Sequence, residues 1–326
     1  MPRTARAVAA LFWAILTVGS LPCPGHASNC CAPTVPPQGL LGETVALPHT
    51  LDLGLHYEYL RSAGRYEGSE RVDDPENKHE IWNRVTLTAN YGVSHRFGVA
   101  AVVPYLWKEK SWYVASWGKR RDINTAGLGD VTLMLRFSPL VRSFVDFREL
   151  SVSFGLKFPT GATDLKESGL GLSEVLQPGT GSWDYSFGVS YYQGFDRFDC
   201  YASVSYLLTG AHDTTGYVFE FGDLFSYLVT TNVHLHPRID FSLGLSGAYK
   251  AQNEKDTRVL EPNTARRQLW LVPGVQVVAI PEVLRLQLFF EQPVYQDFEG
   301  EQLGSDFNIR LSAAYSLPLS KSEEED

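Results

Sequence analysis

The stretch LDLGLHYEYL, residues 51–60, decides the fold because apolar and polar residues alternate along it. Every odd position from Leu51 to Tyr59 is apolar, and the even positions between them are Asp, Gly, His and Glu. Successive side chains of a β-strand point to opposite faces. The stretch therefore predicts a strand with one apolar face and one polar face.

Eleven further runs of this kind follow along the chain. They lie near 81–91, 97–107, 130–137, 150–158, 183–191, 198–208, 224–235, 240–249, 269–279, 284–291 and 306–315. Ten residues of strand rise about 33 Å and, tilted by about 40°, cover about 25 Å, the height of an outer-membrane apolar band.

The two faces of these runs differ sharply in composition. None of the 63 positions on the apolar face carries a charge, although 20% of the chain is charged. Aromatic residues gather near the strand ends on that face, as at the two interfaces of a bilayer. In a soluble β-sandwich, each sheet needs one apolar face, which points to the inside. A barrel with lipid outside and water inside explains both the uniformly apolar face and the charged face of these runs. We expect an all-β fold, a transmembrane antiparallel β-barrel of about 12 strands.

The connections between the runs alternate in length. Those after the odd-numbered runs are mostly long, such as 108–129 and 159–182, and those after the even-numbered runs are mostly short, such as 92–96. Outer-membrane barrels have long outer loops and short periplasmic turns. This rhythm predicts an outer-membrane protein of a Gram-negative-type bacterium, with both termini in the periplasm.

The chain ends define the remaining segments. Residues 1–27 resemble a secretory signal peptide, with two arginines before the apolar run AVAALFWAIL and small residues before the cleavage site. That run is shorter than the roughly 18 apolar residues of a membrane anchor. We expect a periplasmic lead over 28–50, the barrel over 51–316 and an acidic periplasmic tail over 317–326.

Charge and cysteine content exclude several classes of protein. The chain of 326 residues has a formal net charge of -9, which does not favour binding to nucleic acid. Cys30 and Cys31 precede the barrel, and they would bind a soft metal, form a vicinal disulfide or lie in a flexible lead. Cys200 is expected on the lipid face. No cofactor and no resident metal site are expected.

Charged residues on the polar face are the candidate lumen or constriction residues. They are Arg84, Asp130, Arg136, Lys157, Asp184, Asp199, Arg285, Glu291, Asp306 and Arg310. Facing groups of opposite charge would orient water and set ion preference in a pore. Alternatively, they would pair across strands and fill a narrow barrel.

Two enzymatic interpretations do not fit the residues of this sequence. A hydrolase at the outer rim needs His and Ser together on the lipid face, and the apolar positions carry neither. The sequence Gly127-Leu128-Gly129-Asp130 lacks the third glycine and the following helix of a phosphate-binding loop. It is better explained as the start of a strand, so we expect no enzymatic activity.

The segment 108–126 is basic in an otherwise acidic chain. It contains Lys108, Lys110, Lys119, Arg120 and Arg121 together with two tryptophans. As an outer loop, it would either contact the phosphates of lipopolysaccharide or simply be exposed.

Several stretches together resemble a known family. They are FGVAAVVPY (97–105), GLGDVTLMLRF (127–137), GLKFPTG (155–161), TGSWDYSFGVSYYQGF (180–195), PGVQVV (273–278) and LFFEQPVYQ (288–296). They are similar to the outer-membrane transporter family associated with the meta-cleavage pathway of phenol degradation. The resemblance implies a porin-like barrel that transports small molecules, with hydrophobic or aromatic compounds first.

The function expected from these features is that of a channel or transporter. Its lumen would be polar and partly closed by outer loops such as 159–182. The expected partners are outer-membrane lipid and lipopolysaccharide, the outer-membrane assembly machinery and a small-molecule permeant. The alternative is a plugged structural or adhesion barrel that acts through its surface loops.

Overall fold

The computed structural model describes residues 45–116, 118–141, 148–214, 216–256 and 259–319. The predicted signal peptide, most of the lead with Cys30 and Cys31, and the end of the acidic tail lie outside these residues. In the described part of the chain, no helix is both long enough and apolar enough to span a membrane.

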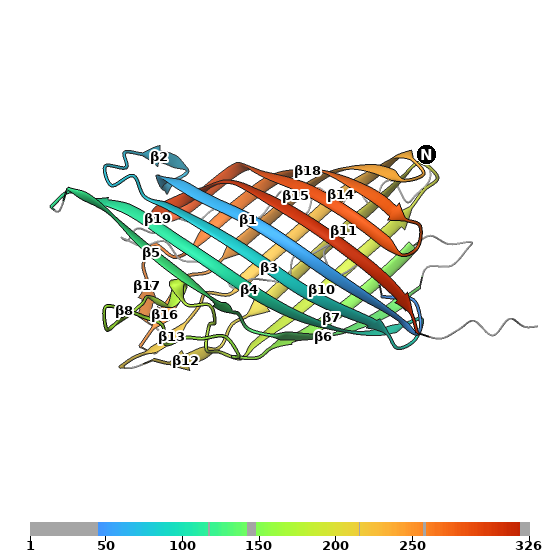
Figure 1. The fold of residues 1–326 in the computed structure, drawn as a ribbon, viewed down its shortest axis with the longest axis horizontal. Coiled ribbons are helices and arrows are strands. Elements are labelled where there is room, and N and C mark those ends of the chain that lie inside the picture. The colour runs from blue at the N-terminus through green and yellow to red at the C-terminus, as the bar shows by residue number, and fades with distance from the viewer. Residues whose placement is uncertain (1–44, 117, 142–147, 215, 257–258, 320–326) are drawn as a thin grey trace, which may run out of the picture.

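Eleven strands in the described residues form a closed antiparallel barrel, with strands tilted to its axis (Figure 1). They are β1 (Thr50–Gly68), β3 (His79–Gly92), β4 (Phe97–Val114), β6 (Thr132–Leu140), β7 (Arg148–Lys157), β10 (Asp184–Gly194), β11 (Phe198–Leu208), β14 (Leu224–His236), β15 (Ile239–Lys250), β18 (Arg266–Ile280) and β19 (Leu284–Pro318). Pairing between β1 and β19 closes the ring.

The long strand β19 crosses the barrel wall twice. Its first half pairs with β18 from Leu284 to Phe298, and its second half pairs with β1 as far as Pro318. Gly300 lies between the halves with φ of 56°, a conformation that glycine adopts without strain. The eleven strands therefore make twelve passes, and the prediction of about twelve is confirmed.

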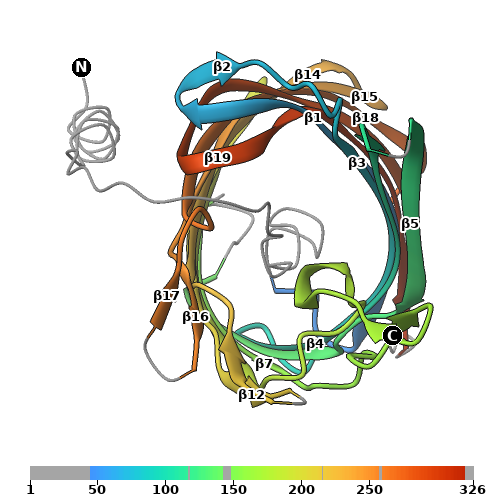
Figure 2. The same cartoon turned by 90° about the vertical axis from the view of Figure 1, so that its left-hand side faces the viewer.

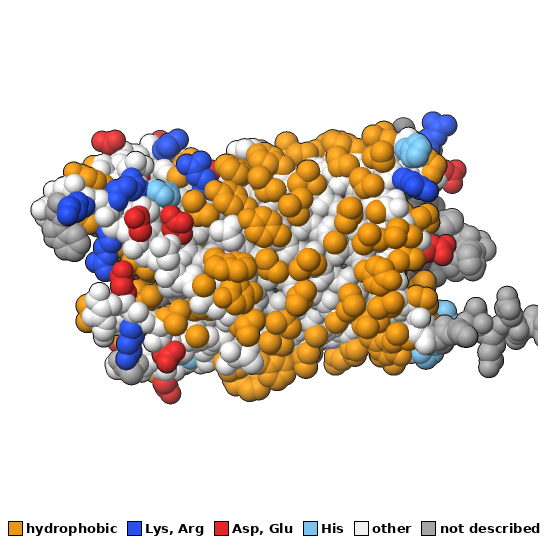
Figure 3. Space-filling model, in the orientation of Figure 1, with side chains coloured by type: hydrophobic (Ala, Val, Ile, Leu, Met, Phe, Trp, Pro, Cys, Tyr) orange, Lys and Arg blue, Asp and Glu red, His pale blue; other side chains and the backbone are white. Residues whose placement is uncertain are grey.

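The distribution of side chains is inverted relative to that of a soluble protein. Outward-facing Leu55, Leu87 and Leu135 are each more than half exposed, whereas inward-facing His56 and Asn90 are almost fully buried. On the face that Figure 3 shows, apolar side chains form a broad band across the middle of the barrel, and charged groups gather at its two ends. This arrangement suits hydrocarbon outside and polar groups inside.

The two ends of the barrel differ in how the strands are joined. At one end, here the turn end, short connections such as 93–96 and 195–197 join the strands, and Thr50 pairs with Pro318. At the other end, the loop end, three segments of 15 or more residues leave the wall. These are residues 158–183, 209–223 and 251–265.

Three of the predicted long loops are largely strand. Residues 61–68 continue β1, 108–114 continue β4, and 292–305 lie within β19. The chain also returns along β4 as β5 (Lys119–Leu128), and β2 (Glu70–Val72) pairs with β1. Backbone pairing continues beyond the apolar band because ladder hydrogen bonds do not require apolar side chains.

The segments 209–223 and 251–265 at the loop end contribute the strands of what we call the cap, which lies at the rim of the barrel mouth (Figure 2). A four-stranded sheet contains β12 (Ala211–Asp213), β13 (Val218–Glu220), β16 (Asn253–Lys255) and β17 (Val259–Glu261). The segment 158–183 contains β8 (Lys166–Glu167), β9 (Leu170–Gly171) and the short 3₁₀ helix η1 (Glu174–Leu176). Figure 2 shows η1 inside the ring of strands when the barrel is viewed from this end.

Candidate functional site

An apolar strip runs along the inner face of β4. Ala100, Val102 and Leu106 point inward and are buried, with Pro104 between them. The neighbouring strand β3 presents polar groups to the same lumen, including Thr86 and Thr88. Within the polar lumen that the sequence predicts, β4 is an exception, because its residues 97–107 are apolar on both faces.

Pro104 is tolerated in the middle of β4 because the partner strand bulges there. Val102 pairs with Thr132 of β6, whereas Tyr105 pairs with Leu128 of β5. Three residues, 129–131, therefore lie opposite two on β4. A proline, which has no backbone N–H, belongs at such an interruption of the ladder.

The bulge also anchors the segment that we call the lid, residues 162–179. Asp130 accepts hydrogen bonds from the backbone N–H groups of Gly161 at 2.9 Å and Thr180 at 2.8 Å. The N–H of Gly179 donates to the carbonyl oxygen of Ala162 at 2.9 Å, so the two ends of the lid lie side by side. We call this pair of segments, 161–162 and 179–180, the neck of the lid. The sequence Gly127-Leu128-Gly129-Asp130 thus serves as a docking point for the neck.

The tip of the lid, which consists of η1 and Gln177, is held inside the mouth by polar contacts. Lys108 Nζ donates to the carbonyl oxygens of Val175 at 2.9 Å and Gln177 at 2.6 Å. Thr125 Oγ1 donates to the carbonyl oxygen of Leu176 at 2.7 Å. All three acceptors belong to η1 or the residue after it, so the barrel wall grips the tip through its backbone.

Apolar packing supports the same part of the lid. A buried cluster contains Ile123 of β5, Val175 and Leu176 of η1, and Phe219 and Phe221 of the cap. Burying a side chain of this size is worth about 1.5–3 kcal/mol. The lid tip is therefore held both by wall residues and by the cap.

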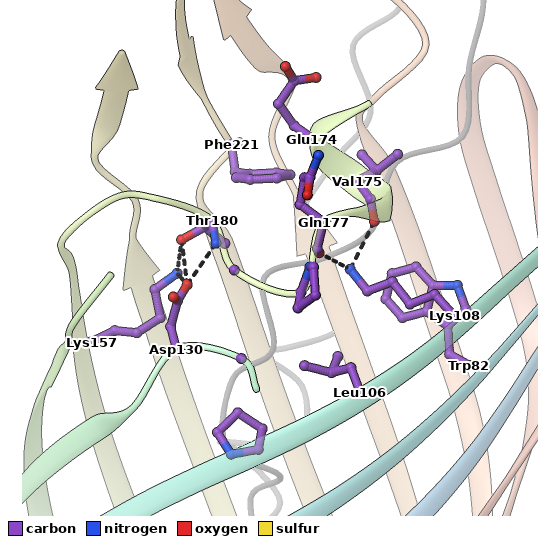
Figure 4. A pocket seen from close by; sticks show the side chains of 14 residues that line it. Trp82, Leu106, Lys108, Asp130, Lys157, Glu174, Val175, Gln177, Thr180 and Phe221 are labelled. Carbon is purple, nitrogen blue, oxygen red and sulfur yellow. Dashed lines mark hydrogen bonds and ion pairs between the residues drawn. The ribbon is translucent and has the colours of Figure 1, made fainter. Parts of the chain in front are cut away.

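A small cavity lies between the lid tip and the inner wall (Figure 4). Its walls include Trp82, Leu106, Lys108, Val175 and Phe221, and its volume is about 30 Å³. That is the space of about one water molecule, whereas a cavity of roughly 150 Å³ accommodates benzene. In this conformation the lid leaves no room for an aromatic ring.

Two titratable groups in the cap have shifted pKa values. Burial and a hydrogen bond to Glu174 raise the pKa of Tyr217 to about 12. Burial raises the pKa of Glu220 above its usual range, and the negative charge of Glu254, its cross-strand partner, adds to the shift. At neutral pH the Tyr217 hydroxyl therefore remains protonated and donates to the lid residue Glu174.

The predicted lumen residues fall into separate clusters instead of one ring. In the first cluster, Glu58 forms ion pairs with Arg84 and Arg310, and Arg310 also pairs with Glu291. Asn308 Nδ2 donates to Glu291 Oε2 at 3.0 Å. This cluster crosses β1, β3 and β19, and Glu58 within it is buried.

The second cluster lies where the lid leaves the wall. Lys157, the last residue of β7, pairs with Asp184, the first residue of β10, and lies 3.4 Å from Asp130. Lys157 Nζ also donates to Thr180 Oγ1 at 2.6 Å. These three predicted residues thus meet beside the neck of the lid, as Figure 4 shows for Asp130 and Lys157.

The remaining predicted residues lie elsewhere. Asp199 accepts from Asn232 Nδ2 at 2.6 Å and lies 3.7 Å from His234 at the turn end. Asp306 lies 3.5 Å from the exposed Arg61 near the loop end. Arg136 is buried in the lumen, and Arg285 is exposed at the turn end. Most of the ten residues therefore form cross-strand pairs, in several groups along the barrel.

The sequence interpretation missed the residues that line the cavity. The sequence predicts Lys108 in an outer basic loop, but it is a buried residue of β4, and its ammonium lies 4.6 Å from the centroid of the Trp82 ring. Arg121 pairs with the lid residue Glu167, and Lys110 pairs with Glu80. The available signal was the loss of alternation over 97–107, where both faces are apolar.

Comparisons with solved structures identify the fold. The COG4313 outer membrane channel from Pseudomonas putida F1 superposes with a TM-score of 0.64 at 15% identity, covering 85% of this chain and 98% of that one. The Pseudomonas putida toluene transporter TodX gives a TM-score of 0.42 at 10% identity, covering 83% and 90%. None of the curated protein sequences matches the chain.

The family comparison covers most of the barrel. The model described as "Putative MetA-pathway of phenol degradation" matches residues 78–303. The match extends from the start of β3 into the second half of β19, and it includes β4, the lid and the cap. It confirms the resemblance found in the sequence, and the chain belongs to this family.

Proposed function

We propose that this protein is an outer-membrane channel for small molecules, with apolar and aromatic compounds as the first candidates. The observation that carries the proposal is the apolar strip on the inner face of β4, which leads to the cavity beneath the lid. A barrel that only anchored surface loops would need no apolar path in its interior. The family description and the channel from Pseudomonas putida F1 support the same function.

The loop end faces the outside of the cell in this proposal. The long segments gather there, and the short turns gather at the end where Thr50 pairs with Pro318. Both termini then lie in the periplasm. The signal peptide covers residues 1–27, and the lead over 28–50 precedes the barrel. The outward apolar band contacts lipid, the exposed loop end contacts lipopolysaccharide, and the outer-membrane assembly machinery inserts the barrel.

Transport through this path requires movement of the lid. The cavity of about 30 Å³ holds no aromatic ring, and η1 lies inside the mouth. The neck is pinned to Asp130, whereas the tip depends on contacts with Lys108 and Thr125 and on the apolar cluster. The tip is therefore the part that moves, about a fixed neck.

Liposome swelling with a lid-excised variant tests the proposal. Residues 163–176 are replaced by a short Gly-Ser linker, which is geometrically feasible because the neck is already closed. Arabinose and benzenesulfonate serve as solutes because neither crosses lipid readily. We expect faster swelling with both solutes than for the intact protein, with benzenesulfonate gaining more. Heat-modifiable gel migration checks that the barrel is intact, and no gain in swelling would contradict the proposal.

A further inference from the structure

The ammonium group of Lys108 is placed unusually for a barrel lysine. The residue is buried, its Nζ donates to two lid carbonyl oxygens, and it lies over the face of Trp82, its cross-strand partner (Figure 4). A buried charged group is costly when its hydrogen bonds are broken without replacement. Removal of the lid tip from the mouth would take away both carbonyl acceptors at once.

The surroundings of this ammonium group are mainly apolar. Trp82, Pro104, Leu106 and Phe221 line the cavity around it. Three further charged residues line the cavity, but Lys157 lies 3.4 Å from Asp130 beside the neck, and Glu174 is hydrogen-bonded to Tyr217. A molecule that enters when the tip moves therefore meets flat hydrocarbon walls and the ammonium group of Lys108. The complementary ligand has a flat apolar ring and an oxygen acceptor at its edge, because ammonium donors and an indole face together recognise such a shape.

We propose that Lys108, Trp82 and Leu106 form a binding subsite for aromatic oxyanions, such as aryl carboxylates and phenolates. The oxygen of the ligand takes the place of the Val175 and Gln177 carbonyls on Lys108, and the ring packs between Trp82 and Leu106. Because ligand and lid tip compete for the same donors, binding and lid release are coupled. The inference rests on the proposed channel function and adds the ligand class and the opening signal.

Coupling of this kind has a second consequence. By thermodynamic linkage, a change that loosens the lid tip without touching the subsite must strengthen ligand binding. Tyr217 offers such a change, since its hydroxyl donates to Glu174 of η1 from outside the subsite. The variant Tyr217→Phe removes that bond, keeps the ring and should bind aromatic oxyanions more tightly than the wild type.

Calorimetric titration of the full chain in detergent micelles tests the subsite. The probes are benzoate, acetate, which lacks the ring, and benzyltrimethylammonium, which carries the wrong charge. We expect Lys108→Met to weaken benzoate binding by about tenfold or more, whereas Lys119→Met, at the exposed start of β5, leaves it unchanged. Acetate and benzyltrimethylammonium should bind much more weakly than benzoate, and Tyr217→Phe should bind benzoate more tightly.

Several results would overturn the subsite. These are equal benzoate affinity in the two lysine variants, equal binding of benzoate and acetate, or no benzoate binding by the wild type. If Lys108→Met fails to fold, single-channel recording of the wild type replaces it: benzoate should lengthen openings, acetate should not, and equal effects refute the proposal. Swelling of liposomes that contain the lid-excised variant tests the channel function separately. A failure of the subsite can therefore be distinguished from a failure of the channel function.

Discussion

Gly161 and Gly179 meet backbone to backbone at the neck of the lid. A Cβ on Gly179 would lie 2.4 Å from the carbonyl oxygen of Gly161, and backbone cannot move aside as a flexible side chain can. Gly171 lies in the same lid, and a Cβ there would meet nothing within 4 Å. The close approach, and not any need for positive φ, explains glycine at the neck.

The first prediction concerns this contact. Gly179→Ala should open the neck, displace the lid and raise solute flux in proteoliposomes, while Gly171→Ala should leave flux unchanged. Both proteins should retain heat-modifiable migration, because neither position belongs to the barrel wall. Identical flux in the two variants would show that the neck does not position the lid.

The ion pairs of Glu58 provide a second prediction at this scale. Glu58→Gln removes the negative partner of Arg84 and one of the two negative partners of Arg310, and both arginine side chains are largely buried. The change should lower the free energy of unfolding by about 3–5 kcal/mol. Asp306→Asn is the matched control, since its partner Arg61 is exposed and such pairs are worth about 0–1 kcal/mol. Urea unfolding in lipid vesicles measures the free energy of unfolding of both variants. An equal decrease in the two variants would mean that the Glu58 cluster is as solvated as the pair of Asp306 and Arg61.

At the level of elements, the cap sheet carries two facing acids. Glu220 of β13 pairs directly with Glu254 of β16, and burial with this like charge raises the pKa of Glu220. The folded pKa thus exceeds the unfolded value. The stability given by the neutral carboxyl is complete below the unfolded pKa and is lost as the pH rises through the folded pKa.

The third prediction follows from that sign. Acidification from neutral pH should slow amide exchange in β13 and β16 after correction for the intrinsic rate, because the raised pKa of Glu220 means that the folded protein takes up a proton more readily than the unfolded chain. Glu220→Gln should show slow exchange throughout, and Glu282→Gln, at the turn end, should behave as the wild type. Faster exchange on acidification would contradict the assigned direction of the shift.

The strands were predictable from sequence because period-2 alternation is a local signal. Runs such as 51–60 and 198–208 lie within β1 and β11, and the residues of their apolar face, such as Leu55 and Val204, point outward. The strand extensions above the apolar band were missed because alternation of polar residues with one another carries no such signal. At β4 the apolar residues of the inner face are visible in the sequence. Contact with lipid explains only one apolar face, so it does not predict the second.

The lid and its cavity could not be predicted in the same way. Lys108, Thr125 and the η1 carbonyls come from segments about 50–70 residues apart, and their contact depends on the path of an irregular loop. Alternation predicts that the charged residues lie on the polar face, but how they group depends on strand register. Register placed Arg84 and Arg310 on either side of Glu58.

The whole molecule is a cylinder of strands with an apolar band on its outer face (Figures 1 and 3). Its interior is largely polar, with an apolar strip along β4, and a cap lies at one end. The fourth prediction is that the purified, leader-free chain requires detergent to remain dispersed. It should also migrate differently on gels before and after boiling, because a closed ladder resists unfolding by detergent at room temperature. A monodisperse protein in plain buffer with identical migration would be incompatible with an outward apolar band.

Single-channel recording in planar bilayers tests the central claim most directly. The account predicts closed or briefly opening wild-type protein, and steady openings when residues 163–176 are replaced by a linker, since this removes η1 from inside the mouth. Both proteins are recorded at the same salt and voltage. If the lid-excised barrel carries no current although it is folded and inserted, the lumen is not a path and the channel function is contradicted.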